Sequence, residues 1–477
     1  MVLSDDRHFR GAGGIAELLP IAFPIIVSNA SETAMMFVDR IFLAHLGKQH
    51  MAAAMIGGLS LFTTLSFFIG VMNYTNALVA QHLGSRQKSR CPVAVVQALY
   101  LVLISIPFML LMIWVGPRLF ALFGHAPVQL ELETTYYRIL LIGSVFMLGR
   151  FAFTGFFAGI GRTRIIMTSN IVAMVVNIGA NYVLIFGKFG FPELGMAGAA
   201  TGTIIGRLAA LAMLAAAYFS QRNRSEYGTH RTFAFERTMF GKLLRFGLPA
   251  GIELMLNVVA FNFVVQILHS YGPDIAAAVT ITFNWDLVAF IPMVGLNVAV
   301  MSLVGRYMGA RDHKHAEKSA YSGAKLTYCY AAFMMLLFIT IPDVLASAFA
   351  PDLPDVDYSH VLPLAWTMIR LAALYTLADA TFLVFGGALR GAGDTAWIMK
   401  ASVSLHWVMA IVLFVAVKVW RVPPLGAWLL FICFVIGFAV IALTRFRSGK
   451  WKQIQVVKPP PAPVPGGPPP NGDLQQH

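Results

Sequence analysis

Long apolar stretches separated by short polar breaks fill most of this chain. Each stretch has about the 20 residues that a helix needs to cross the hydrocarbon core of a bilayer, and the breaks include turns as short as HLGKQ and SYGPD. The pattern predicts an all-α polytopic membrane protein with twelve transmembrane helices. The predicted spans are 14–44, 51–82, 92–116, 133–158, 164–187, 195–220, 241–269, 275–307, 319–342, 361–389, 396–419 and 424–446.

The two ends of the chain fall outside this pattern. Residues 1–13 precede the first span without a cleavage-like sequence, so we expect them to be retained and not removed as a signal peptide. Residues 447–477 contain PPPAPVPGGPPP, which offers too few apolar side chains for a packed domain. The composition predicts a disordered, polyproline-like tail.

Composition narrows the class of protein. Hydrophobic residues make up 58% of the chain, the mean hydropathy is +0.72, and only 12% of residues are charged, against about 25% in soluble chains. These values exclude an ordinary cytosolic enzyme, a disordered protein and a nucleic-acid-binding protein, although the net charge is +13. Cys91, Cys329 and Cys433 lie far apart without a CxxC pair, so they predict neither a metal site nor a disulfide framework.

The positive charges indicate the orientation of the spans. If the N-terminus lies in the cytoplasm, most of the 35 Lys and Arg residues fall in cytoplasmic segments, and 221–245 is the richest of these. The outer loops hold few basic residues. By the positive-inside rule, we expect a multi-pass protein of the plasma membrane, the inner membrane in a bacterium, with both termini in the cytoplasm.

The chain contains an internal duplication. At an offset of 225 residues, the first two spans match the seventh and eighth, with the identical pairs Pro24/Pro249, Gly70/Gly295 and Gly84/Gly309. Six spans per half is an even number, so the halves enter the membrane in one orientation and are related by a pseudo-two-fold axis along the membrane normal. Parallel repeats of this kind occur in secondary transporters. The predicted domains are an N-lobe (1–220), a cytoplasmic linker (221–240), a C-lobe (241–446) and the tail (447–477).

Three stretches carry a resemblance to a known family. They are VDRIFLAHLG at 38–47, VNIGANYVLIFG followed by LGMAGAATGT within 176–203, and ADATFLVFGGALRGAGDT at 378–395. The chain resembles the multidrug and toxic compound extrusion (MATE) family, part of the multidrug/oligosaccharidyl-lipid/polysaccharide exporter superfamily. The resemblance implies two six-helix lobes that export organic cations or other amphipathic compounds in exchange for Na⁺ or H⁺. It implies no cofactor besides that coupling ion.

Five acidic residues lie within the predicted spans, where an unpaired carboxylate costs a few kcal/mol to insert. Each should therefore face a cavity, an ion or a basic partner. They are Glu32, Asp39, Glu253, Asp286 and Asp379.

By the resemblance, Asp39 is the carboxylate of the N-lobe. Asn177, Asn181 and Thr203 are its candidate partners on the fifth and sixth spans, and the two asparagines are one helical turn apart on one face. A carboxylate, two amide oxygens and a hydroxyl suit a hard cation such as Na⁺, whereas the carboxylate alone suffices for a proton. We therefore expect a site for Na⁺ or a proton at Asp39.

In the C-lobe, Asp379 matches the family motif, and Glu253 reaches a similar depth on the seventh span. We expect both to serve in coupling or substrate binding. The acid that relatives carry on this span falls at Asn257, one turn after Glu253, and Glu32 is the symmetry mate of Asn257. Asn257 and Glu32 are therefore further candidates, whereas Asp286 matches no motif.

The intramembrane arginines give each acid a second interpretation, a static salt bridge. For Asp39, the candidate partners are Arg40, Arg150 and Arg207, and Arg138 and Arg370 also lie in or near the spans. Pro24 lies mid-helix in the first span, where it frees a carbonyl; it is either a hinge or an ordinary membrane-helix kink.

The sequence thus predicts a monomeric antiporter that moves amphipathic or cationic small molecules by alternating access in contact with membrane lipids. The alternative is a lipid or lipid-linked oligosaccharide flippase of the same superfamily, which the intramembrane arginines favour because anionic cargo needs cationic partners. An enzyme is not expected, because no HExxH, GxSxG or clustered histidine motif is present.

Overall fold

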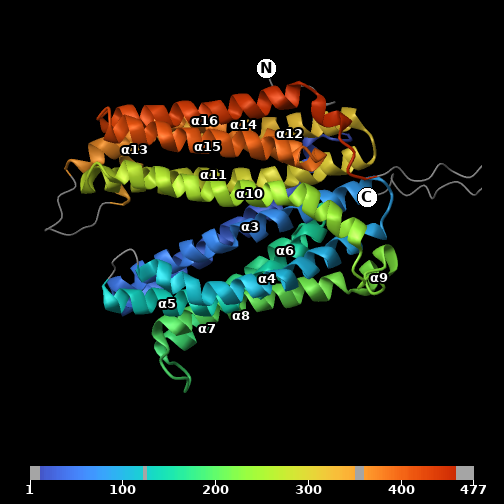
Figure 1. Cartoon of the computed structure of the whole chain (residues 1–477), viewed down its shortest axis with the longest axis horizontal. Helices are drawn as coiled ribbons and strands as arrows, with labels where there is room; N and C mark the ends of the chain where they lie inside the picture. The colour runs from blue at the N-terminus through green and yellow to red at the C-terminus, as the bar shows by residue number, and fades with distance from the viewer. Residues whose placement is uncertain (1–10, 122–125, 350–358, 458–477) are drawn as a thin grey trace, which may run out of the picture.

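A computed structural model of the chain describes residues 11–121, 126–349 and 359–457, and every regular element in these ranges is helical. Eleven helices are long and apolar enough to cross a membrane, and a bent pair makes twelve if it counts as one span. The prediction of an all-α protein with twelve spans is confirmed (Figure 1). The helices are α2 (Ile15–Leu46), α3 (Lys48–Gly84), α4 (Arg90–Ala121), α5 (Pro127–Ile142), α6 (Ser144–Gly159), α7 (Arg164–Phe186), α8 (Gly195–Tyr218), α9 (Gln221–Tyr227), α10 (Arg237–His269), α11 (Pro273–Gly309), α12 (His313–Thr340), α13 (Pro342–Ser347), α14 (Val361–Ala392), α15 (Thr395–Lys418), α16 (Pro424–Arg447) and the 3₁₀ helix η1 (Lys450–Gln453).

The predicted fourth span is the bent pair, because α5 and α6 meet at an angle of 45°. Gly143 lies at the break, and a Cβ atom there would come within 2.6 Å of the Ile204 Cδ1 atom on α8. The Ser144 hydroxyl donates to the Leu141 carbonyl oxygen at 2.5 Å beside the break. A glycine therefore lets α8 pack closely against the bend.

Two bundles make up the molecule, α2–α8 and α10–α16, in agreement with the predicted lobes (Figure 1). The duplication is visible in the backbone. Gly47 and Gly272 connect the first two helices of each lobe with φ of 133° and 128°, and Arg86 and Arg311 follow with φ of 60° and 59°. The repeat therefore extends to turns that use the left-handed region, which few residues adopt.

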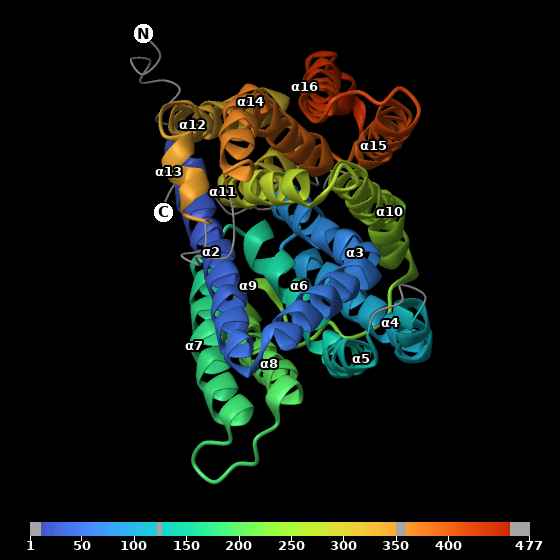
Figure 2. The same ribbon diagram turned by 90° about the vertical axis from the view of Figure 1, so that its left-hand side faces the viewer.

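The first helix of each lobe packs against the other lobe. Helix α2 contacts α7 of its own lobe and α11 of the C-lobe, whereas α10 contacts α15 of its own lobe and α3 of the N-lobe. Figure 2 shows the two helices as connections on opposite sides of the molecule. Each lobe thus contributes its first helix to a contact with the second helix of the other lobe.

The lobes meet at the end where α3 and α11 finish. A Cβ atom added to Gly84 would overlap the Arg306 carbonyl, and one added to its symmetry mate Gly309 would overlap the Gln81 carbonyl. The Gln81 amide also donates to the Gly391 carbonyl oxygen at 2.8 Å. Toward the opposite end the ribbons of the two lobes diverge (Figure 1). We call the first end the closed end.

Residues 448–457 form an ordered segment at this end, although their composition predicts a disordered tail; residues 458–477 lie outside the described residues. Trp451 is 1% exposed, belongs to a C-lobe core cluster and stacks on Phe446 with ring centroids 5.0 Å apart. Farther along, Val456 is buried in a core cluster with Tyr74 of the N-lobe. This segment, the strap, therefore contacts both lobes.

The linker between the lobes packs mainly on the N-lobe. Glu226 on α9 forms ion pairs with Arg162 at 2.6 Å and Lys88 at 3.3 Å. Arg90 also forms an ion pair with Glu236 just before α10. Burial raises the pKa of the Glu226 carboxyl, but the hydrogen bonds and charges of Arg162 and Lys88 outweigh that effect and leave the pKa below its ordinary value.

Candidate functional site

The structure brings together all four predicted residues of the N-lobe site. Asp39 on α2 is buried, and the Asn181 amide on α7 donates to its Oδ1 atom at 2.5 Å. The same amide lies 3.5 Å from Asn177 Oδ1, and the Asn177 amide lies 3.5 Å from the Thr203 hydroxyl on α8. Asn177 and Asn181 face Asp39 because they are one turn apart on α7.

Glycine makes this arrangement possible on the α8 side. A Cβ atom at Gly202 would lie 2.9 Å from the Asn181 Cγ atom, so any other residue would displace the amide. The Asn181 Oδ1 atom is buried and makes no hydrogen bond with the described residues. This oxygen and the Asp39 carboxylate are therefore available to a cation, and the Thr203 hydroxyl could add a lone pair.

No ion pair joins Asp39 to any of its three candidate arginines among the described residues. Arg40 is exposed, and Arg150 binds another acid. Arg207 on α8 interacts electrostatically with Asp39, but no ion pair within 4 Å joins the two. Its Nη1 atom is buried without a hydrogen-bond partner among the described residues. Asp39 thus has a cation nearby and no salt bridge in the described part of the chain.

Glu32 lies in an ion pair, as the static interpretation proposed. Its Oε1 atom is 2.5 Å from Arg150 Nη1 on α6. Asn170 on α7 accepts from Arg150 at 2.7 Å and donates to Ser28 on α2 at 2.5 Å. The network ties three helices of the N-lobe together, and its charges are balanced.

Glu253 of the C-lobe is likewise paired. It is 3% exposed and accepts two hydrogen bonds from Arg390 on α14, at 2.5 Å from Nη2 and 3.3 Å from Nε. Its neighbour Asn257 instead donates to Ser402 on α15 at 2.8 Å. Arg390 belongs to the LRG part of the motif, so one role of that motif is to neutralise a buried acid.

Asp379 lies near an acid that sequence reasoning ranked lowest. Asp379 on α14 and Asp286 on α11 interact electrostatically with each other and with the buried Tyr375 on α14. Neither carboxylate forms an ion pair in the described part of the chain. Two interacting carboxylates with no basic partner favour the binding of a proton or another cation. No local pattern could identify Asp286, because its partner is on another helix.

The remaining residues singled out in the sequence are Arg138, Arg370 and Pro24. Arg138 and Arg370 are exposed. Helix α2 continues through Pro24, which has no N–H group to bond the Pro20 carbonyl. The Thr163 hydroxyl donates to that carbonyl oxygen at 3.3 Å instead. The freed carbonyl thus anchors α2 to the start of α7, and the hinge role stays a prediction.

The chain matches the family model described as MatE over residues 24–183 and 249–415. It is 28% identical over 451 residues to the probable multidrug resistance protein NorM of Mesorhizobium japonicum, covering 94% of this chain and 95% of that protein. The corresponding protein of Thermotoga maritima is 26% identical over 444 residues, with 92% and 94% covered.

Solved structures share the fold. A structure described as MATE in the bent conformation matches with a TM-score of 0.83 at 18% identity, covering 94% of this chain and 98% of the other. A transporter from Pyrococcus furiosus, described as having a binding pocket of reverse polarity, has the same TM-score, identity and coverage. An outward-facing multidrug resistance transporter matches with a TM-score of 0.82 at 18% identity, with 94% and 98% covered.

Proposed function

Because the chain belongs to the MATE family of transporters, we propose that it is an antiporter that exports organic cations or amphipathic drugs in exchange for Na⁺ or H⁺. The observation that carries the proposal is Asp39, a buried carboxylate that faces amide and hydroxyl groups and has no salt bridge in the described part of the chain. The NorM relatives, named for multidrug resistance, support the substrate class.

The mechanism is alternating access between the two lobes. The closed end faces the cytoplasm, as expected from the basic loops, and the coupling ion enters from the opposite side. A cation that neutralises Asp39 removes the charge that holds a cationic substrate, so the two ligands compete. Exchange also requires that each ligand bind the two conformations with different affinities.

The acid pair Asp379 and Asp286 supplies a second cation site in the C-lobe. Because neither acid has a basic partner in the described residues, the pair should hold at least one proton or cation whenever water is excluded. We assign Glu253 and Glu32 to structural ion pairs with Arg390 and Arg150, and they serve as internal controls.

The decisive experiment is ethidium export in proteoliposomes with the Na⁺ and pH gradients imposed separately. Asp39→Asn should abolish gradient-driven export, while the protein remains monodisperse. Glu32→Gln alters a paired acid on the same helix and should retain gradient coupling. Full gradient-dependent export by Asp39→Asn would refute the proposed role of Asp39.

A lipid or lipid-linked oligosaccharide flippase is the second candidate function. The guanidinium of Arg207, with its buried Nη1 atom unpartnered, favours it because an anionic phosphate headgroup would satisfy that donor. If the protein is a flippase, lipid translocation should depend on Arg207 and should need no ion gradient. Loss of ethidium export in Asp39→Asn with no lipid flipping by the wild type would exclude this candidate.

A further inference from the structure

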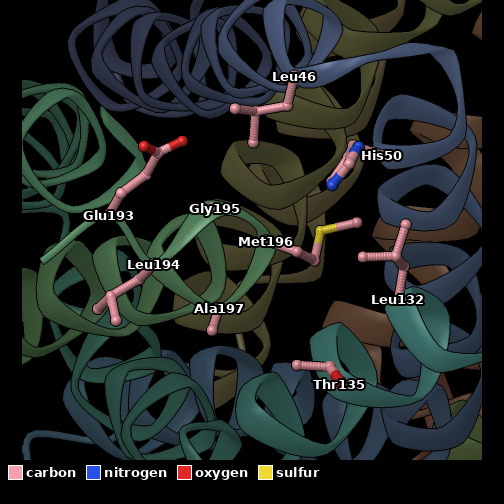
Figure 3. Close-up of a pocket in the computed structure, with 9 residues that line it drawn as sticks. All are labelled: Leu46, His50, Leu132, Thr135, Glu193, Leu194, Gly195, Met196 and Ala197. Carbon is pink, nitrogen blue, oxygen red and sulfur yellow. The ribbon is translucent and has the colours of Figure 1, made fainter. Parts of the chain in front are cut away.

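A cavity of about 550 Å³ opens in the N-lobe at the end remote from the closed end. It lies between the end of α2, the start of α3, the first half of α5 and the start of α8 with its preceding loop (Figure 3). Its volume is in the range of pockets that hold drug-sized ligands, roughly 300–1,000 Å³.

The lining combines polar and apolar groups in similar measure. Leu46, Leu132 and Met196 form apolar walls, and Figure 3 shows Met196 between Glu193 on one side and His50 on the other. The Glu193 carboxylate is exposed and makes no ion pair with the described residues. The His50 Nδ1 atom is buried without a hydrogen-bond partner among them.

These groups suit one chemical class of ligand. A carboxylate and an imidazole nitrogen can accept hydrogen bonds from an amine, and the leucine and methionine walls can pack against rings. An inorganic cation would need several oxygen ligands, and here Glu193 and Thr135 are the side chains that supply them. A proton would need no cavity at all. The lining therefore favours an amphipathic organic cation.

The cavity lies about two helical turns from the Asp39 cluster, toward the end remote from the closed end. Leu46 follows Asp39 by seven residues on α2, and Met196 precedes Thr203 by seven residues on α8. Seven residues are two turns, so each pair shares a helix face with a separation of about 10 Å. On α5, Thr135 lines the cavity, and the next residue, Tyr136, interacts with Asp39. Three helices thus connect the two sites.

We propose that this cavity is a second, outer binding site for amphipathic organic cations, occupied after the substrate leaves Asp39 and before it reaches the external solution. The inference rests on the proposed export function. Glu193 attracts the positive charge of the substrate, His50 accepts a hydrogen bond from it, and the apolar walls hold its rings.

The test is ethidium binding to the purified full-length protein, followed by fluorescence anisotropy. In an Asp39→Asn background the outer site should still bind ethidium. Glu193→Gln should weaken that binding about two- to fivefold, the effect of an exposed charge pair, and should not change binding of an uncharged phenanthridine. Ala197→Phe, which fills the cavity, should abolish binding of both.

Controls keep the inference falsifiable. Glu131→Gln removes an exposed acid on α5 that does not line the cavity, and it should bind ethidium as the parent does. Thr135→Phe fills the cavity from another helix if Ala197→Phe does not fold. Two results would overturn the outer site. The first is ethidium binding as tight as that of the Asp39→Asn parent in both Glu193→Gln and a cavity-filling variant. The second is no ethidium binding by the Asp39→Asn parent itself. Neither result touches the proposed function, which fails only if Asp39→Asn retains gradient-driven export.

Discussion

Replacing Gly84 or Gly309 by alanine is expected to open the closed end of the transporter. The two glycines end α3 and α11, and each helix approaches the backbone of the other at this point. A Cβ atom on Gly84 would lie 2.7 Å from the Arg306 carbonyl carbon, and one on Gly309 would lie 2.7 Å from that of Gln81. Both obstacles are backbone atoms, so no side chain can rotate away.

The size of the effect follows from these distances. Carbon atoms in contact lie about 3.5–4.0 Å apart, and the carbonyl oxygens lie closer to the added methyl groups than the carbonyl carbons do, so the two helices must separate by about 1 Å or more. Overpacking of this kind costs typically 1–3 kcal/mol. The penalty applies only while the ends of α3 and α11 are in contact. It should therefore shift the conformational equilibrium about 5- to 150-fold toward separated lobes.

The assay measures the distance between spin labels attached at Ser89→Cys and Lys314→Cys by double electron–electron resonance. Both positions are exposed near the closed end; Ser89 directly precedes α4, and Lys314 lies on α12. Cys329 and Cys433 are exposed and would first be replaced by serine. Gly84→Ala and Gly309→Ala should each enlarge the fraction of long distances.

Gly58→Ala is the matched control, because a Cβ atom at Gly58 on α3 meets nothing within 4 Å. It accounts for the gain in helix propensity, about 1 kcal/mol, that any such replacement brings. If Gly84→Ala and Gly309→Ala give the same distance distribution as Gly58→Ala, the contact does not hold the closed end.

Three further outcomes are expected. Trp451→Ala should lower the free energy of unfolding by about 3–5 kcal/mol, because the indole is 1% exposed; a thermal melt of the purified protein measures this, and an unchanged melt would show that the strap adds no stability. Arg390→Met should destabilise the protein by about 3–5 kcal/mol, because it leaves Glu253 buried and unpaired, and adding Glu253→Met should recover part of that loss in the same melt. The linker should detach in acid: the Glu226 carboxyl has a pKa below its ordinary value of 4.5, so the stabilisation it contributes is present above that value and is lost as pH falls through the folded-state pKa. Limited proteolysis between pH 7 and pH 3 should detect the release, and Arg162→Ala should remove the pH dependence.

The spans were predictable because an apolar run is a local property of the chain. Such a run does not reveal where a span bends, since the stretch around Gly143 is mostly apolar and the break depends on the approach of Ile204 from α8. The Asp39 cluster followed from the motifs and from helical spacing, because Asn177 and Asn181 must share a face.

Pairing between distant helices was beyond the reach of the sequence. The sequence predicts Glu253 at the depth of Asp379, but Glu253 pairs with Arg390, which follows Asp379 by about three turns on α14, whereas Asp379 interacts with Asp286 on α11. The strap was missed for a different reason. Trp451 and Val456 belong to a short stretch in front of a proline-rich segment, and their burial depends on both lobes.

The reciprocal packing of α2 and α10 has a consequence for biosynthesis. Helix α2 is synthesised well before its C-lobe partner α11, which ends at Gly309. At about 5–20 residues per second, roughly ten to fifty seconds separate the two events. During that interval the face of α2 that will contact α11 is exposed to lipid or to insertion factors. The two duplicated lobes are therefore expected to finish folding together, because α2 of the N-lobe reaches its full set of contacts only after α11 of the C-lobe has been synthesised.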